Sequence, residues 1–179
     1  MAKNNHSIGN AGEFYVLDQL AQRGYIAGKT DDGQTLIDVI ATDPETLKSI
    51  NIQVKTRDGA GDAWLMSAKN ERVFDGLWYV LLQLNGTDVM PDFYVFHSSF
   101  IGPWLHEDHY SWLAKPKKNG EPKKDSNMRR FRPSDDELEK TRDRSGVPNR
   151  RFVLNPEPCR QLLGGSVYRR FRLCSGQVS

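Results

Sequence analysis

The chain has 179 residues, enough to bury one hydrophobic core and too few for two full-sized domains. Its composition, 37% hydrophobic and 27% charged, is that of a globular protein, and no apolar run approaches the roughly 20 residues of a membrane span. We therefore expect no membrane helix. The polar N-terminal segment lacks the pattern of a secretory signal, so the expected location is cytoplasmic. Cys159 and Cys174 form no CxxC pair, which argues against a disulfide framework.

The formal net charge of +2 conceals an uneven distribution along the chain. Residues 1–114 hold 8 basic and 15 acidic side chains, a balance of −7. Residues 115–179 hold 17 basic and 8 acidic side chains, a balance of +9. Such a split indicates an anionic partner for the basic part, and nucleic acid is the first candidate. A solvated basic tail without a dedicated partner is the alternative.

The first predicted element is a helix over residues 7–23. Val16, Leu17 and Leu20 fall on one face at helical spacing, with Ser7 as N-cap and Gly24 as the C-terminal stop. A short strand is expected at residues 25–27. Residues 35–41 and 49–56 are rich in Ile and Val and are separated by turn-forming residues, so they predict an antiparallel hairpin.

Further strands are predicted at residues 77–84, a continuous apolar run typical of a strand buried on both faces, and at residues 93–96. Residues 98–113 have helical character that Gly102 and Pro103 are expected to interrupt. Residues 115–127 contain almost no apolar side chain and predict a mobile loop. A capping box at residues 134–137 opens a short helix; another helix at 158–163 and a strand at 167–173 complete the prediction.

Strand alternation places polar groups together on one face of the predicted hairpin. Side chains alternate faces along a strand, so Gln53 and Lys55 project side by side while Ile52 and Val54 face the core. Asp38, on the partner strand, lies among apolar neighbours, where an unpaired charge would be costly. Glu13 lies on the apolar stripe of the first helix. Two carboxylates, an amide and an ammonium are therefore expected to converge.

This set of groups suits phosphodiester hydrolysis. Mg²⁺ is usually held by one or two carboxylates together with waters and substrate phosphate, and an amide oxygen can join them. A nearby lysine can stabilise charge on a phosphorus centre and orient an attacking water, while the metal lowers the pKa of that water. The motif is short, and its specificity comes from the shared strand face and the core-facing Glu13.

The arrangement of Glu13 on the first helix, Asp38, and Gln53-Val54-Lys55 on the next strand resembles the PD-(D/E)XK nuclease superfamily, especially its Holliday-junction-resolvase-like branches. The resemblance implies an α/β restriction-endonuclease-like αβββαβ core, a mixed sheet flanked by helices, at residues 1–114. It implies Mg²⁺ or Mn²⁺ held by Glu13, Asp38, Gln53 and Val54, with Lys55 as the catalytic lysine. Ile37 stands where the family has proline, and Gln53 where it has Asp or Glu, which lowers the negative charge of the site.

Residues 115–179 form a basic extension that we expect to pack on the same domain. Eight of its arginines, interleaved with aromatic residues, are candidates for DNA contacts: Arg129, Arg130, Arg132, Arg150, Arg151, Arg169, Arg170 and Arg172. A salt-bridged surface is the alternative for each of them. The resemblance also allows a homodimer, because cutting a duplex takes two active sites.

Three alternatives to a nuclease stay open at this stage. Glu13 and Asp38 could form ordinary ion pairs with Lys55 or Arg57. The fold could also serve a catalytically inactive nucleic-acid-binding or regulatory protein, which the neutral Gln53 favours. A zinc site could be formed by residues of one region, His97, His106, Glu107, Asp108 and His109, although they make no complete ligand set. Because the sequence lacks P-loop, GxGxxG and GxSxG motifs, we expect no organic cofactor and no serine hydrolase.

Overall fold

A computed structural model describes residues 5–31, 36–59 and 61–141 of the chain. Its centre is a five-stranded mixed sheet with the spatial order β1-β2-β3-β5-β6. The strands are β1 (Ile26–Lys29), β2 (Val39–Thr42), β3 (Ser49–Asp58), β5 (Leu77–Leu84) and β6 (Asp92–His97). Only the β3–β5 pair among them is parallel; the other pairs are antiparallel. The predicted α/β class, with a mixed sheet and flanking helices, is confirmed.

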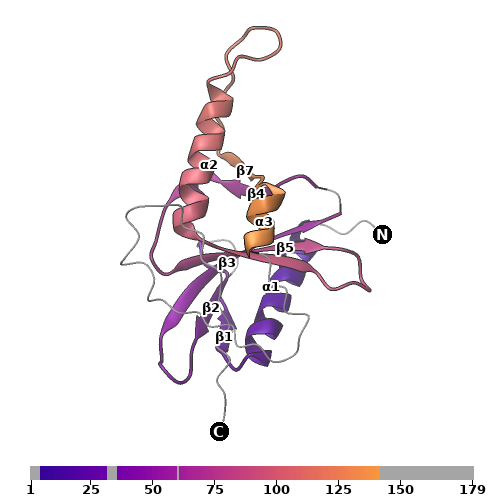
Figure 1. The fold of residues 1–179 in the computed structure, drawn as a ribbon, viewed down its shortest axis with the longest axis vertical. Coiled ribbons are helices and arrows are strands. Elements are labelled where there is room, and N and C mark those ends of the chain that lie inside the picture. Colours follow the sequence, from indigo (N-terminus) through magenta and orange to yellow (C-terminus); the bar gives the residue numbers. More distant parts are fainter. Residues whose placement is uncertain (1–4, 32–35, 60, 142–179) are drawn as a thin grey trace.

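One face of the sheet is covered by helix α1 (Asn5–Gln22) (Figure 1). Val16 and Leu20 of α1 pack on a buried cluster that includes Val39, Ile52 and Val54. The predicted helix at 7–23 is therefore confirmed, but Ser7 is not its N-cap, because the helix begins two residues earlier. Gly24 ends it with a φ of 83°, a backbone conformation that glycine adopts without steric cost.

The opposite face carries a second core. Two of its elements lie between β3 and β5 in the sequence, and two follow β6. These are β4 (Trp64–Ser67), the 3₁₀ helix η1 (Ala68–Glu71), α2 (Ser98–Leu113) and β7 (Met128–Phe131). β4 and β7 pair as a separate two-stranded sheet. Trp64, Phe96, Ile101 and Phe131 belong to the buried cluster beneath them. The part after residue 115 thus contributes a buried aromatic side chain to the main body.

Helix α2 is continuous from Ser98 to Leu113, so the expected interruption at Gly102 and Pro103 is wrong. Gly102 is needed for close packing, because a Cβ atom at this position would lie 2.5 Å from the backbone oxygen of Glu71. The close packing of Gly102 against η1 outweighs the low helix propensity of this residue. In Figure 1, α2 rises away from the sheet and ends in a loop that projects beyond the body of the molecule.

The capping box predicted at residues 134–137 is confirmed at the start of α3 (Asp135–Thr141). The Ser134 backbone N–H donates to Glu137 Oε2 at 2.7 Å, and the Glu137 N–H donates to Ser134 Oγ at 3.3 Å. The predicted helix at 158–163 and strand at 167–173 lie outside the described residues. In the described part of the chain, no helix is long and apolar enough to cross a membrane.

Candidate active site

Asp38 is fixed by main-chain contacts at the point where β2 begins. Its N–H donates to Ile52 O at 2.8 Å, and its carbonyl accepts from Thr30 N at 2.9 Å. These bonds continue the register in which Val39 faces Ile52, so Asp38 lies opposite Gln53 on the face away from α1. Its Oδ2 atom accepts a hydrogen bond from Val54 N at 2.8 Å. The carboxylate is therefore held in one position by the backbone of β3.

Gln53 is almost completely buried, with 2% of its surface exposed. Its side-chain Nε2 donates to Asp38 Oδ2 and lies 3.5 Å from the carbonyl oxygen of Val54. Its Oε1 atom is buried and has no hydrogen-bond partner among the described residues. A buried carbonyl oxygen left without a partner costs about 1–3 kcal/mol, so this atom calls for a ligand that supplies positive charge or a hydrogen.

Glu13 lies on α1 and pairs with a residue of β1. Its Oε2 lies 2.9 Å from Lys29 Nζ, and the Glu13 side chain is only 15% exposed. The contact is an ion pair without good hydrogen-bond geometry, since Glu13 Oε2 makes no hydrogen bond. Lys29 Nζ also donates to Asn10 Oδ1 at 3.2 Å. The ordinary ion-pair alternative for Glu13 is thus realised with Lys29 and not with Lys55 or Arg57.

Lys55 carries a partly buried ammonium that is influenced by both carboxylates. Burial lowers the pKa of Lys55, nearby Asp38 raises it, Lys69 lowers it and Glu13 raises it, and the net effect is a lowered pKa. Asp38 and, more weakly, Glu13 therefore lie within electrostatic range of the Lys55 ammonium. Among the described residues the Lys55 ammonium makes no hydrogen bond and no ion pair within 4 Å. Its amine therefore has no structural partner there.

The donor set fits a hard divalent cation. Asp38, Glu13, the unpartnered Gln53 Oε1 and the Val54 carbonyl are all oxygen donors of the kind that Mg²⁺ and Mn²⁺ accept. Only two of them are carboxylates, and no group of three or more His, Cys, Asp and Glu residues able to hold a metal occurs in the described ranges. Any cation at this place would depend on the amide oxygen and on oxygens from water or substrate.

Two further residues lie on this face: Arg57, which the sequence analysis considered only as an ion-pair partner, and Tyr79, which it missed. Arg57 continues the series of alternate residues Gln53 and Lys55 on one face of β3. Its guanidinium carbon lies 3.6 Å from the centroid of the Trp64 ring. Tyr79 is the strand neighbour of Gln53 across the parallel β3–β5 pair, and burial raises the pKa of its phenol, with Asp38 adding to the effect. Strand period alone would have found Arg57, whereas Tyr79 required the register of β5.

The predicted DNA-contact arginines fall into different environments. Arg129 is 4% exposed, and its Nε bonds to Glu71 Oε1, so its side chain lies inside the body with a structural partner. Arg130 is exposed, and Arg132 Nε lies 3.7 Å from Asp62. The remaining five predicted arginines, Arg150, Arg151, Arg169, Arg170 and Arg172, lie outside the described residues.

The histidines weighed as zinc ligands have separate partners, and His97 Nε2 lies 2.9 Å from Asp75 O. His106 Nδ1 lies 3.2 Å from Glu71 Oε2, and His109 Nε2 lies 2.8 Å from Asp125 Oδ1. His109 is buried, whereas His106 is 60% exposed. His106 and His109 thus tie α2 to different segments of the chain, η1 in one case and the loop that follows α2 in the other.

Comparison with known proteins gives one structural likeness to describe. No protein-family model matches the sequence, and no curated protein is similar to it. Among solved structures the chain is similar to a bacterial homing endonuclease, I-Ssp6803I, with a TM-score of 0.40 and 12% sequence identity. The alignment covers 56% of this chain and 70% of that chain. At this level the likeness carries no argument about activity, which must rest on the residues described above.

Proposed function

We propose that the protein is a metal-dependent endonuclease that hydrolyses DNA phosphodiester bonds at a site formed by Glu13, Asp38, Gln53 and Lys55. The observations that carry the proposal are the partly buried Lys55 ammonium, which has no side-chain partner and is influenced by Asp38 and Glu13, and the buried Gln53 Oε1 without a partner. Charged groups with shifted pKa values and no structural partner concentrate at catalytic sites. The predicted PD-(D/E)XK resemblance agrees with this assignment.

Each side chain has a definite task in the proposed reaction. A divalent cation held by Asp38, Glu13, Gln53 Oε1 and Val54 O would lower the pKa of an attacking water and neutralise phosphate charge. Asp38 is the rigid member, because Val54 N and Gln53 Nε2 hold its Oδ2 in place. Lys55, with its lowered pKa, orients the attacking water and exchanges a proton with it more readily than an ordinary lysine.

The neutral Gln53 supports a second candidate, a catalytically inactive nucleic-acid-binding protein with the same fold. In the described arrangement the Gln53 amide nitrogen bonds to Asp38, so part of the carboxylate is already satisfied without a cation. Such a protein would bind DNA without needing Lys55. The two candidates differ in the effect of metal and in the effect of replacing Lys55.

The test is a panel of supercoiled plasmid, linear duplex, single-stranded and four-way-junction DNA, incubated with Mg²⁺ or Mn²⁺ and with EDTA. The proposal predicts metal-dependent cutting of at least one substrate, lost in Lys55→Ala and retained in Lys48→Ala, a control on an exposed turn. Salt-sensitive DNA binding without cutting would favour the inactive protein. A homodimer is part of the proposal only if the cut is double-stranded, and sedimentation of the parent protein would then test it.

A further inference from the structure

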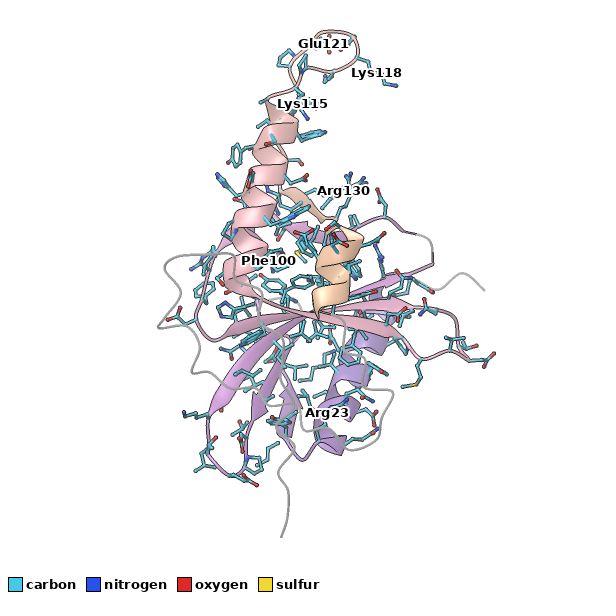
Figure 2. The ribbon with its side chains drawn as sticks, in the orientation of Figure 1. Arg23, Phe100, Lys115, Lys118, Glu121 and Arg130 are labelled. Carbon is cyan, nitrogen blue, oxygen red and sulfur yellow. The ribbon has the colours of Figure 1, made fainter. Side chains whose placement is uncertain are left out.

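Residues 110–125, here called the arm, extend from the last turn of α2 into the loop that follows it. Figure 2 shows Lys115 at the end of the helix and Lys118 and Glu121 at the tip of the loop, beyond the body of the molecule. The loop is closed by a hydrogen-bonded turn, in which Lys117 N donates to Glu121 O at 2.8 Å and Gly120 N donates to Lys117 O at 2.9 Å. Gly120 has a φ of 83°.

The arm concentrates positive charge. Within it, five lysines face two acids, a net charge of +3. Both acids are already engaged: Glu121 pairs with Lys117 at 3.1 Å, and Asp125 pairs with His109 at 2.8 Å. The side chains of Lys115, Lys118 and Lys124 are exposed and make no hydrogen bond or ion pair among the described residues. Three cations are therefore held out from the body without partners.

The arm is also tied to its helix by internal contacts. Lys123 Nζ donates to the carbonyl oxygen of Trp112 at 2.6 Å and lies 4.6 Å from the centre of the Trp112 ring. The ring of His109 lies 5.7 Å from the same indole. The Trp112 ring is thus already in contact with Lys123 and close to His109, which makes it a poor platform for stacking an unpaired base. The free groups of the arm are point charges, and these suit a phosphate backbone.

We propose that the arm is a second DNA contact, in which Lys115, Lys118 and Lys124 bind the phosphate backbone of a duplex at a distance from the cutting site. This inference rests on the proposed function, since it takes double-stranded DNA as the substrate. Helix α2, with 16 residues, is about 24 Å long, which corresponds to roughly seven base pairs along a duplex. The arm would therefore add affinity and orientation without touching the scissile phosphate.

The test is duplex binding, measured by fluorescence anisotropy in EDTA over a series of salt concentrations. Each lost phosphate contact lowers the slope of log affinity against log salt by about 0.9, so the triple variant Lys115→Gln, Lys118→Gln, Lys124→Gln should lower it by about 2.7. Between about 50 and 200 mM salt, the parent protein should then lose about 40-fold more affinity than the triple variant. The exposed Lys48→Gln, on the turn between β2 and β3, is the matched control and should leave the slope unchanged.

A second variant acts in the opposite direction. Glu121→Gln releases Lys117 from its ion pair, so it should raise the affinity for duplex DNA and steepen the salt slope. An unchanged slope in the triple variant, with normal binding by the parent, would overturn the role of the arm and leave the proposed nuclease intact. A lowered slope in a protein that never cuts would support the arm and contradict the catalytic assignment. The inference would be overturned if the parent did not bind duplex DNA. It would also be overturned if the triple variant lost binding to phosphatidylserine vesicles but kept its binding to duplex DNA.

Discussion

The buried ion pair between Arg129 and Glu71 predicts a large loss of stability in Glu71→Gln. Arg129 is 4% exposed and donates to Glu71 Oε1, to Ser126 O at 2.6 Å and to Met128 O at 3.0 Å. Removing the charge of Glu71 leaves the guanidinium buried, with Asp125 at 3.9 Å as the nearest remaining carboxylate. Breaking a buried pair costs about 3–5 kcal/mol, and the 18% exposure of Glu71 places this case near about 3 kcal/mol.

Thermal and urea unfolding measure this cost. For a chain of this length, about 3 kcal/mol corresponds to a decrease in Tm of about 6–12 °C. Glu121→Gln is the control, because its pair with Lys117 is exposed on both sides and its loss should barely change stability. A decrease of less than about 1 kcal/mol in Glu71→Gln would refute the assignment of Arg129 to a structural role and would return it to the candidate DNA contacts.

The same pair gives a pH dependence with a definite sign. Burial alone would raise the pKa of Glu71, but hydrogen bonds and charge from Arg129 and His106 outweigh it, and the pKa falls below the ordinary value of 4.5. A carboxylate whose pKa is lowered by folding adds stability above its unfolded pKa, and this stability is lost as the pH falls through the folded pKa. The difference in free energy of unfolding between the parent and Glu71→Gln should therefore be largest at neutral pH and shrink below about pH 4.5.

Three further predictions concern single side chains. Lys55→Met removes a desolvated ammonium without an ion pair, so urea unfolding should show a more stable variant at neutral pH. This gain in stability should shrink as the pH rises toward 10.5. A less stable variant would mean that Lys55 is held by a structural pair. Gly102→Ala places a Cβ 2.5 Å from Glu71 O and should destabilise the protein by about 1–3 kcal/mol, whereas Gly9→Ala in α1 meets nothing within 4 Å and should not. Ser134→Ala removes the capping box and should speed amide hydrogen exchange in α3, an effect equivalent to about 1 kcal/mol; unchanged exchange would count against the cap.

The sequence predicted the elements whose signals are local. The Ile- and Val-rich hairpin, the buried run at Leu77–Leu84 and the capping box at Ser134 follow from alternation, apolar continuity and end-group hydrogen bonds. The prediction that α2 is interrupted was wrong, because the close approach of Gly102 to Glu71 outweighs local propensity. This contact joins distant segments, so local sequence could not reveal it. β4 and β7 were not predicted, since each is short and is stabilised by pairing with the other.

The candidate site was predictable as far as one strand and its neighbour reach. Alternation along β3 placed Gln53 and Lys55 on one face, and the hairpin brought Asp38 opposite them. The pairing of Glu13 with Lys29 could not be predicted, because it depends on how α1 lies against β1. The burial of Arg129 was missed for a similar reason, since a run of arginines in sequence does not reveal that β7 buries alternate residues.

The most direct test of the central claim is the rate of plasmid cleavage by Asp38→Asn and Lys55→Ala relative to the parent, in Mn²⁺ and with folding verified by circular dichroism. The account predicts that the parent cuts, and that each variant stays folded, still binds DNA and loses about 10²–10⁴-fold in rate, the contribution expected of a positioned acid–base group or metal ligand. Cutting by both variants at the parent rate would contradict the site built from Glu13, Asp38, Gln53 and Lys55.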